Sequence, residues 1–199
     1  MYQLLLDSSN RLLCVALAKE GVLVDDITYN AWQRQSEVMV EEIHNIMKRN
    51  NIKKEDIDSI VVGIGPGSYT GVRIALTIAK TMGYVLKAKV YAVSSLGLFK
   101  IPQKSTICIT NARSNRSYFA VYNDDEVIEK DQILENEQVL EYIKNHPSYL
   151  VSGETEHLGI ESAKFNVANA LLSGLNDKYL VENIYKLNPV YLKDLYNND

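Results

Sequence analysis

The chain has 199 residues, of which 46% are hydrophobic, and a formal net charge of −4. This composition excludes an intrinsically disordered polypeptide and allows one domain or two small fused lobes. No run approaches eighteen consecutive apolar residues, and Asp7 interrupts the apolar N-terminus too early for a secretory signal, so we expect a cytoplasmic protein without a membrane partner.

The basic residues are scattered, with no continuous block of lysine and arginine. Because each phosphate contact needs a cation, this scatter predicts no autonomous binding of nucleic acid, although it leaves open a basic patch that forms only in three dimensions. Cys14 and Cys108 lie in apolar runs without a second cysteine or a histidine at metal-ligand spacing. We interpret both as buried thiols.

Apolar runs in the first half of the chain predict strands. Residues 4–6, 12–17 and 22–29 are separated by short turns and predict an antiparallel meander. Residues 60–62 are β-branched and predict a central strand that is covered on both faces. Residues 90–93 predict a further strand.

Two helices are predicted among these strands. The first begins near Ser36, which we expect to cap it, and has apolar residues every third or fourth position opposite charged ones. The second spans about residues 70–86 and is largely apolar. The apolar repeat of the first helix is Met39, Val40, Ile43, Ile46 and Met47.

The second half of the chain repeats this order. A meander with a hairpin turn at Asp124 and Asp125 is followed by a helix, a strand and a short helix. The interruption near Pro102 predicts two lobes, at residues 1–102 and a smaller one at 103–199. Tandem βββαβα units with mixed sheets are typical of the actin-like (ASKHA, ribonuclease H-like) α/β fold, with two unrelated α/β halves as the alternative. The predicted elements are strands at 107–109, 118–122, 127–134 and 149–151 and helices at 137–144 and 167–172.

A glycine-rich segment, residues 65–75, lies between a predicted strand and a helix. Its glycines permit positive φ and close approach, and Ser68 or Thr70 can cap the helix that follows. A helix N-terminus can hold phosphate, but Gly71 is followed by Val72 and Arg73 and not by the lysine of a Walker motif. A dinucleotide fingerprint fails as well, because no acidic residue follows at the required spacing.

The helix after this loop carries a stripe of small residues at every fourth position. Such a stripe allows another backbone to approach closely. The sequence leaves open whether the stripe packs inside the chain or against a partner, because Ile74, Ile78 and Met82 form a second apolar face. The stripe consists of Gly71, Ala75, Ala79 and Gly83.

The segment 65–74, GPGSYTGVRI, resembles the signature of TsaB, a bacterial family that supports synthesis of threonylcarbamoyl-adenosine next to the tRNA anticodon. The resemblance covers nearly the whole chain in the family's order. The other matching blocks are Leu6-Asp7-Ser8-Ser9, Ser36-Glu37, Asn111-Ala112-Arg113 and Pro189-Val190-Tyr191-Leu192-Lys193.

The resemblance implies a non-catalytic, actin-like scaffold that binds and activates the catalytic paralogue TsaD, with the ATPase TsaE joining the complex and homodimers using the same helix surface. It implies that tRNA is contacted only indirectly. We expect no cofactor on the isolated chain and leave an adenine nucleotide at the complex interface open. The expected interface residues are Ser36, Met39, Val40, Ile43, Gly67, Thr70, Gly71, Arg73, Ile74, Ala75, Ala79 and Gly83.

The residues of a catalytic site are incomplete in the sequence. Asp7 holds one of the two cleft positions at which actin-like ATPases place carboxylates, but Asn111 holds the other, and an amide does not supply the anionic oxygen that Mg²⁺ favours. Arg113 completes this possible residual cleft. The alternative for Asp7 is to form a turn after its strand, and we favour that role. The family often has histidine where Gln35 stands, aspartate at Asn111, and Gly-Glu at Asn115 and Arg116.

The three histidines, His44, His146 and His157, are isolated and are expected to be solvated side chains that bind no metal. The chain has no HExxH or GxSxG motif, so nothing predicts a hydrolase. Two other functions remain as alternatives to the scaffold: a weak nucleotide-binding actin-like ATPase and a dinucleotide-binding oxidoreductase.

Overall fold

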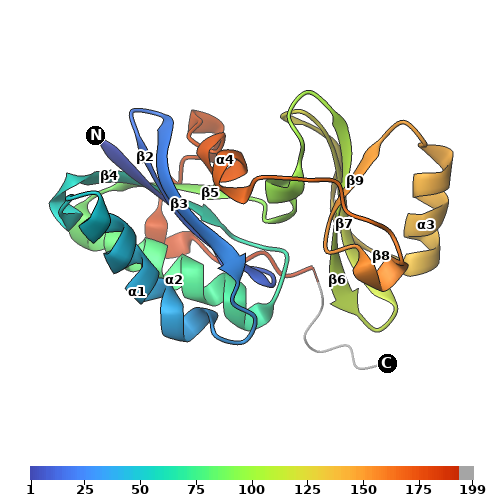
Figure 1. Ribbon diagram of the computed structural model, residues 1–199, viewed down its shortest axis with the longest axis horizontal. Coiled ribbons are helices and arrows are strands. Elements are labelled where there is room, and N and C mark those ends of the chain that lie inside the picture. The colour runs from blue at the N-terminus through green and yellow to red at the C-terminus, as the bar shows by residue number, and fades with distance from the viewer. Residues whose placement is uncertain (193–199) are drawn as a thin grey trace. The chain divides into compact units, whose positions relative to one another are not determined.

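The computed structural model describes residues 1–192, which form two compact units, each built on one mixed β-sheet (Figure 1). The first unit comprises Met1–Ser95 and Val167–Pro189, and the second comprises Leu96–Asn166 with residues 190–192. The division that we expected between residues 102 and 103 therefore differs from the one observed.

The return of the chain to the first unit has a physical cause. The amide of Val181 donates a hydrogen bond to the carbonyl of Val90 at 2.8 Å, and Leu180 forms an antiparallel bridge with Tyr91. The returning segment thereby pairs with the last strand of the first sheet and satisfies edge groups that would otherwise face solvent.

The first sheet has the strand order β3-β2-β1-β4-β5. Its first three strands form the predicted antiparallel meander, and the last two run parallel to β1. Leu5 of β1 is opposite Ala16 and Val61, so the central strand is buried among its neighbours. The strands are β1 (Tyr2–Asp7), β2 (Leu12–Lys19), β3 (Val22–Asn30), β4 (Ile57–Gly63) and β5 (Lys89–Val93).

Helices α1 (Gln35–Arg49) and α2 (Tyr69–Leu86) pack side by side on one face of this sheet, and α4 (Val167–Leu172) covers the other (Figure 1). Because side chains alternate along a strand, Leu4 and Leu6 of β1 enter the core under α1 and α2. Covering both faces explains why the strands read as continuous apolar runs in the sequence.

Helix α1 begins differently from our prediction. Its N-cap is Arg34, which makes no side-chain capping hydrogen bond, and Ser36 lies exposed in the first turn. The helix is held by burial of its apolar side and, near its C-terminus, by Arg49, whose Nη2 donates to Oδ1 of Asp25 at 2.6 Å. Packing, not capping, therefore fixes this helix.

The second sheet has the order β8-β7-β6-β9 and confirms the predicted second meander. Asp124, with φ of 55°, sits in the hairpin turn as expected. Strand β9 pairs parallel to β6, as β4 does to β1, so the two units repeat one arrangement and form a duplicated actin-like fold. The elements are β6 (Ser105–Arg113), β7 (Arg116–Asn123), β8 (Glu126–Glu135), α3 (Asn136–Asn145) and β9 (Leu150–Gly153).

Both thiols are buried, as predicted. Burial raises the pKa of Cys14 to about 12 and also raises that of Cys108, so both are protonated at neutral pH. Within residues 1–192, no helix combines the length and the apolar character needed to cross a bilayer. Short 3-10 helices lie at Lys54–Asp56, Leu96–Phe99, Glu156–Leu158, Asp177–Tyr179 and Ile184–Lys186.

Candidate functional site

The glycine-rich loop joins β4 to α2 and lies against the turn that follows β1. Ser68 is the N-cap of α2, where its Oγ accepts a hydrogen bond from the amide of Gly71 at 3.3 Å. This confirms Ser68 as one of the two residues predicted to cap the helix. Thr70 lies within the first turn of the helix and is exposed.

The glycines of this loop are required by the chain's own backbone. A Cβ atom on Gly67 would overlap the carbonyl oxygen of Ser9, and a Cβ atom on Gly71 would overlap that of Ser8. The amide of Ser68 donates to the carbonyl of Ser9 at 2.6 Å. These glycines therefore allow the loop to lie close to the turn after β1. The turn takes the place that a ligand would have if the loop bound phosphate.

Asp7 ends β1 beneath this loop and is 1% exposed. Its carboxylate accepts hydrogen bonds from the amide and Oγ of Ser9 at 3.2 and 3.0 Å, from Nδ2 of Asn10 at 3.4 Å, and from Oγ of Ser95 at 3.2 Å. The Ser95 Oγ in turn accepts from the amide of Gly65 at 2.9 Å. The carboxylate therefore ties the turn after β1 to the glycine loop, which is the turn-forming role weighed for it above.

Burial raises the pKa of Asp7 from 3.8 to about 6, although its hydrogen bonds to Ser9 and Ser95 oppose the rise. A raised folded-state pKa means that this group stabilises the fold most below pH 3.8 and that the contribution is lost as the pH rises through 6.

We therefore expect Asp7→Asn to flatten one component of the pH dependence of stability. Between about pH 4.5 and about pH 7.5 the free energy of unfolding of the variant should rise relative to wild type by about 2 kcal/mol, because the amide cannot ionise. Urea unfolding of both proteins at the two pH values measures this difference. A difference that stays constant with pH would show that Asp7 titrates near its ordinary pKa.

The small-residue stripe of α2 packs inside the chain. Ala75 and Ala79 are fully buried in the core of the first unit, and a Cβ atom on Gly83 would be 2.5 Å from a methyl group of Val90. The small residues let the helix approach the sheet closely, which is the intramolecular alternative. Met39, Ile43, Gly71, Ala75, Ala79 and Gly83, which we predicted to line a partner surface, are all buried in the folded chain.

Other predicted interface residues do reach the surface. Ser36, Val40 and Thr70 are exposed, with Val40 at 61%. Arg73 is exposed and its guanidinium lies 4.1 Å from the ring centre of Tyr69. Gly67 and Ile74 are half-buried.

The outward face of α2 was not identified from the sequence. It carries Thr77, Thr81, Tyr84 and Val85, all exposed, the last two at 63% and 64%. The signal that could have found it is the spacing of three and four residues, opposite the stripe. This 18-residue helix has no acidic residue and only two basic ones, Arg73 and Lys80, so its exposed face is unusually poor in charge.

The residues of the possible residual cleft do not form one cluster in a single unit. Asp7 belongs to the first unit, whereas Asn111 and Arg113 belong to the second. Oδ1 of Asn111 accepts from the amide of Arg113 at 2.8 Å, and Arg113 has φ of 65°. Asn111 therefore shapes the turn between β6 and β7.

Two of the three histidines are not the solvated side chains that we expected. His146 stacks on Tyr142, and its Nδ1 lies 2.8 Å from that residue's carbonyl oxygen. His157 Nε2 lies 2.8 Å from Oγ of buried Ser117. His44 is exposed. No three His, Cys, Asp or Glu side chains of the described residues are grouped as metal ligands would be.

Comparison with known proteins gives consistent results. A model of the family described as TsaD, tRNA N6-adenosine threonylcarbamoyltransferase, matches residues 29–180, which is more than half of the chain. An uncharacterized protein of Mycoplasma genitalium, MG208, is 28% identical over 98% of this chain and 97% of its own length. The Bacillus subtilis protein named tRNA threonylcarbamoyladenosine biosynthesis protein TsaB is 37% identical over 47% of this chain and 41% of its own length.

The solved structure of YeaZ from Pseudomonas aeruginosa has the same fold, with a TM-score of 0.78 at 20% identity, over 96% of this chain and 99% of that one. Lys193, the last residue of the C-terminal motif, lies outside the described residues. The family match, the TsaB relatives and the shared fold agree with the glycine-rich motif. The chain therefore belongs to the family described as TsaD, tRNA N6-adenosine threonylcarbamoyltransferase, and within it to the TsaB proteins of tRNA threonylcarbamoyladenosine biosynthesis.

Proposed function

We propose that the chain acts in the cytoplasm as a non-catalytic subunit that binds a TsaD-type catalytic partner and activates it for threonylcarbamoyl-adenosine modification of tRNA. The proposed contact surface is the outward face of α2 together with Val40 of α1. The proposal rests on the small number of charged residues on this face. The centres of protein interfaces are depleted of charged residues and enriched in aromatic ones.

The state of Asp7 supports a non-catalytic role. A carboxylate that positions a metal or a phosphate must present its oxygens to the ligand. In this chain four donors from Ser9, Asn10 and Ser95 occupy those oxygens, and the side chain is buried. We propose on this ground that the isolated chain holds no nucleotide or metal in catalysis, and that any adenine nucleotide belongs to the assembled complex.

The same helix face suits a homodimer. A two-fold dimer needs a self-complementary surface, and a long helix with threonine, tyrosine and valine outward can pack against a copy of itself. We propose that homodimer and heterodimer compete for this face, and that a TsaE-type ATPase joins the heterodimer.

Reconstitution tests the proposed function. Alone, the purified chain should transfer no threonylcarbamoyl group to tRNA, and its addition to TsaD-type and TsaE-type partners from the same genome should raise their activity at least tenfold. The physical reason is that a subunit which binds the competent state of its partner more tightly than the other state shifts the population toward it. Product is measured as modified nucleoside after digestion of the tRNA.

The possible outcomes distinguish the scaffold function from its alternatives. Modification by the chain alone would restore an enzymatic function, and turnover of ATP by the chain alone would favour the actin-like ATPase. Complex formation without stimulation would leave binding intact and contradict activation. The isolated chain is also titrated with a dinucleotide. If no saturable binding is seen, the oxidoreductase alternative is excluded.

A further inference from the structure

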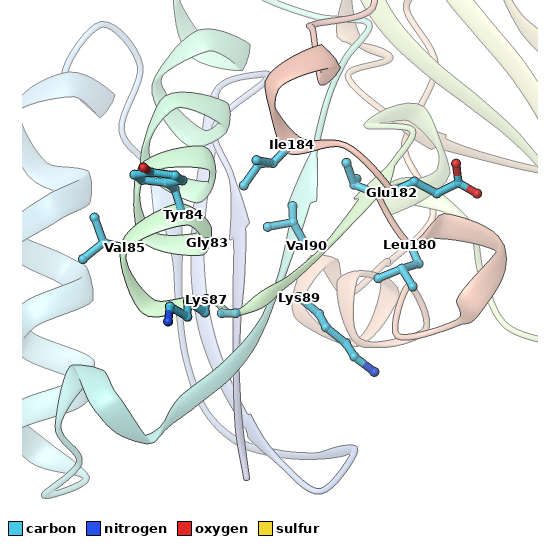
Figure 2. A pocket seen from close by; sticks show the side chains of 11 residues that line it. Gly83, Tyr84, Val85, Lys87, Lys89, Val90, Leu180, Glu182 and Ile184 are labelled. Carbon is cyan, nitrogen blue, oxygen red and sulfur yellow. The ribbon is translucent and has the colours of Figure 1, made fainter.

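A surface hollow of about 700 Å³ lies where the C-terminal end of α2 meets the returning segment of the chain. Its floor is apolar: Val90 and Ile184 pack over Gly83, within 2.9 Å of where a Cβ atom would stand. Figure 2 shows Tyr84 and Val85 projecting from the last turn of α2, and Lys89 and Glu182 projecting outward from the segments that flank the hollow. The hollow is therefore an apolar trough with a polar rim.

The two segments around this hollow are basic, in a chain that is acidic as a whole, and Lys87, Lys89 and Glu182 are the charged residues that line the hollow itself. Residues 80–90 contain three lysines and no carboxylate, and residues 177–187 add two lysines and two carboxylates, which gives +3 locally against −4 for the chain. Lys80 links the two segments, because its Nζ donates to the carbonyl of Leu187 at 2.8 Å. The lysines are Lys80, Lys87, Lys89, Lys178 and Lys186.

Tyrosines stand among these lysines. The ring of Tyr185 is 71% exposed and meets Tyr84 edge to face, with ring centres 5.9 Å apart. Nζ of Lys178 lies 4.7 Å from the ring centre of Tyr179. Exposed aromatic rings between cations are the combination that binds unpaired nucleotides, because each base stacks on a ring while its phosphate meets a cation.

We infer that this hollow and its rim bind unpaired nucleotides of RNA, with bases against Tyr185 and the apolar floor and phosphates against Lys87 and Lys89. The inference rests on the proposed function for the identity of the RNA, which is then the tRNA substrate. It revises the expectation that the chain contacts tRNA only indirectly. Lysines from two distant segments of the sequence lie in the same region of the fold. This is the kind of basic patch, formed only in three dimensions, that the sequence left open.

An acidic peptide is the competing occupant, because lysines attract carboxylates as well as phosphates. The exposed Tyr185 ring favours RNA, since stacking on a tyrosine is general for bases and has no counterpart in an acidic side chain. Membership of a family that acts on tRNA favours RNA independently.

The test measures binding of the full chain to a fluorescein-labelled twelve-nucleotide single-stranded RNA of mixed sequence, by anisotropy at several salt concentrations. Lys87→Gln with Lys89→Gln should weaken binding roughly 10- to 100-fold at about 50 mM salt and flatten the slope of log Kd against log salt by about 1.4. The matched control is Lys104→Gln with Lys130→Gln, two exposed lysines of the second unit, which should change neither value.

Tyrosine variants separate stacking from charge. Tyr185→Ala should weaken binding at least fivefold, whereas Tyr185→Phe should retain it, because phenylalanine keeps the ring face. Equal losses for the two lysine pairs, or wild-type binding weaker than about 1 mM at about 50 mM salt, overturn the inference. So does saturable binding of a polyglutamate peptide without RNA binding. Tyr84 and Val85 also belong to the proposed partner face, so binding is measured at chain concentrations at which size-exclusion chromatography shows a monomer. Failure there is distinguishable from failure of the proposed function, which is read from stimulation of the catalytic partner.

Discussion

Alanine in place of Gly71 is expected to lower the free energy of unfolding by about 3 kcal/mol, because its methyl group would overlap the carbonyl oxygen of Ser8. That oxygen belongs to the buried turn after β1, which cannot move aside without disturbing the hydrogen bonds of Asp7 and Ser9. Thermal unfolding should show the loss as a fall in Tm of roughly 6 to 12 °C for a chain of this size.

The sign of the change in the free energy of unfolding tests the close contact at Gly71. Replacing glycine with alanine inside an exposed helix ordinarily stabilises it by about 1 kcal/mol, because alanine restricts the unfolded chain and favours the helix. Thr81→Ala, at an exposed position of the same helix, serves as the control and should change stability by less than about 1 kcal/mol. A stabilised Gly71→Ala protein would mean that the loop and the turn are farther apart than described.

Arginine in place of Thr77 is expected to weaken binding of the TsaD-type partner by about 30- to 150-fold while leaving the chain folded. Thr77 is exposed on the outward face of α2, so arginine fits the isolated helix without strain. At the centre of a helix contact the same cation would be desolvated without a counter-charge, which costs about 2 to 3 kcal/mol or more. Calorimetric titration of the variant with the partner gives the change.

The control for this experiment is Val22→Arg on β3, which introduces the same cation at an apolar position that is 67% exposed but lies off the proposed interface. It should bind the partner as wild type does. If Thr77→Arg binds equally well, the outward face of α2 is not the contact surface. Ala79→Arg cannot replace it, because Ala79 is fully buried and arginine there would unfold the first unit.

Much of the fold could be predicted from the sequence because its signals are local. The apolar runs of β1 and β4 are bounded by turn residues, and the helix α2 is opened by a capping serine. Each of these features is decided within a few residues, so alternation and capping rules suffice.

The orientation of α2 could not be predicted in this way. Its stripe of small residues and its face of Ile74, Ile78 and Met82 are both compatible with burial, and only the packed structure shows that Ala75 and Ala79 face the sheet. Asp7 raised the same difficulty. A carboxylate after a strand suits a turn or a cleft, and the decision depends on Ser95, which is 88 residues away.

The return of residues 167–189 to the first unit has a consequence for synthesis of the chain. The second unit is continuous over Leu96–Asn166 and can fold as soon as it leaves the ribosome, whereas the first lacks α4 and the bond from Val181 to Val90 until that returning segment is made. Until then one face of the first sheet, including Leu5 and Val61, has no helix over it. The half that is translated first thus waits for its last helix until residues 167–189 are made, and a nascent chain stalled just before Val167 would present the whole second sheet attached to an N-terminal unit in need of protection.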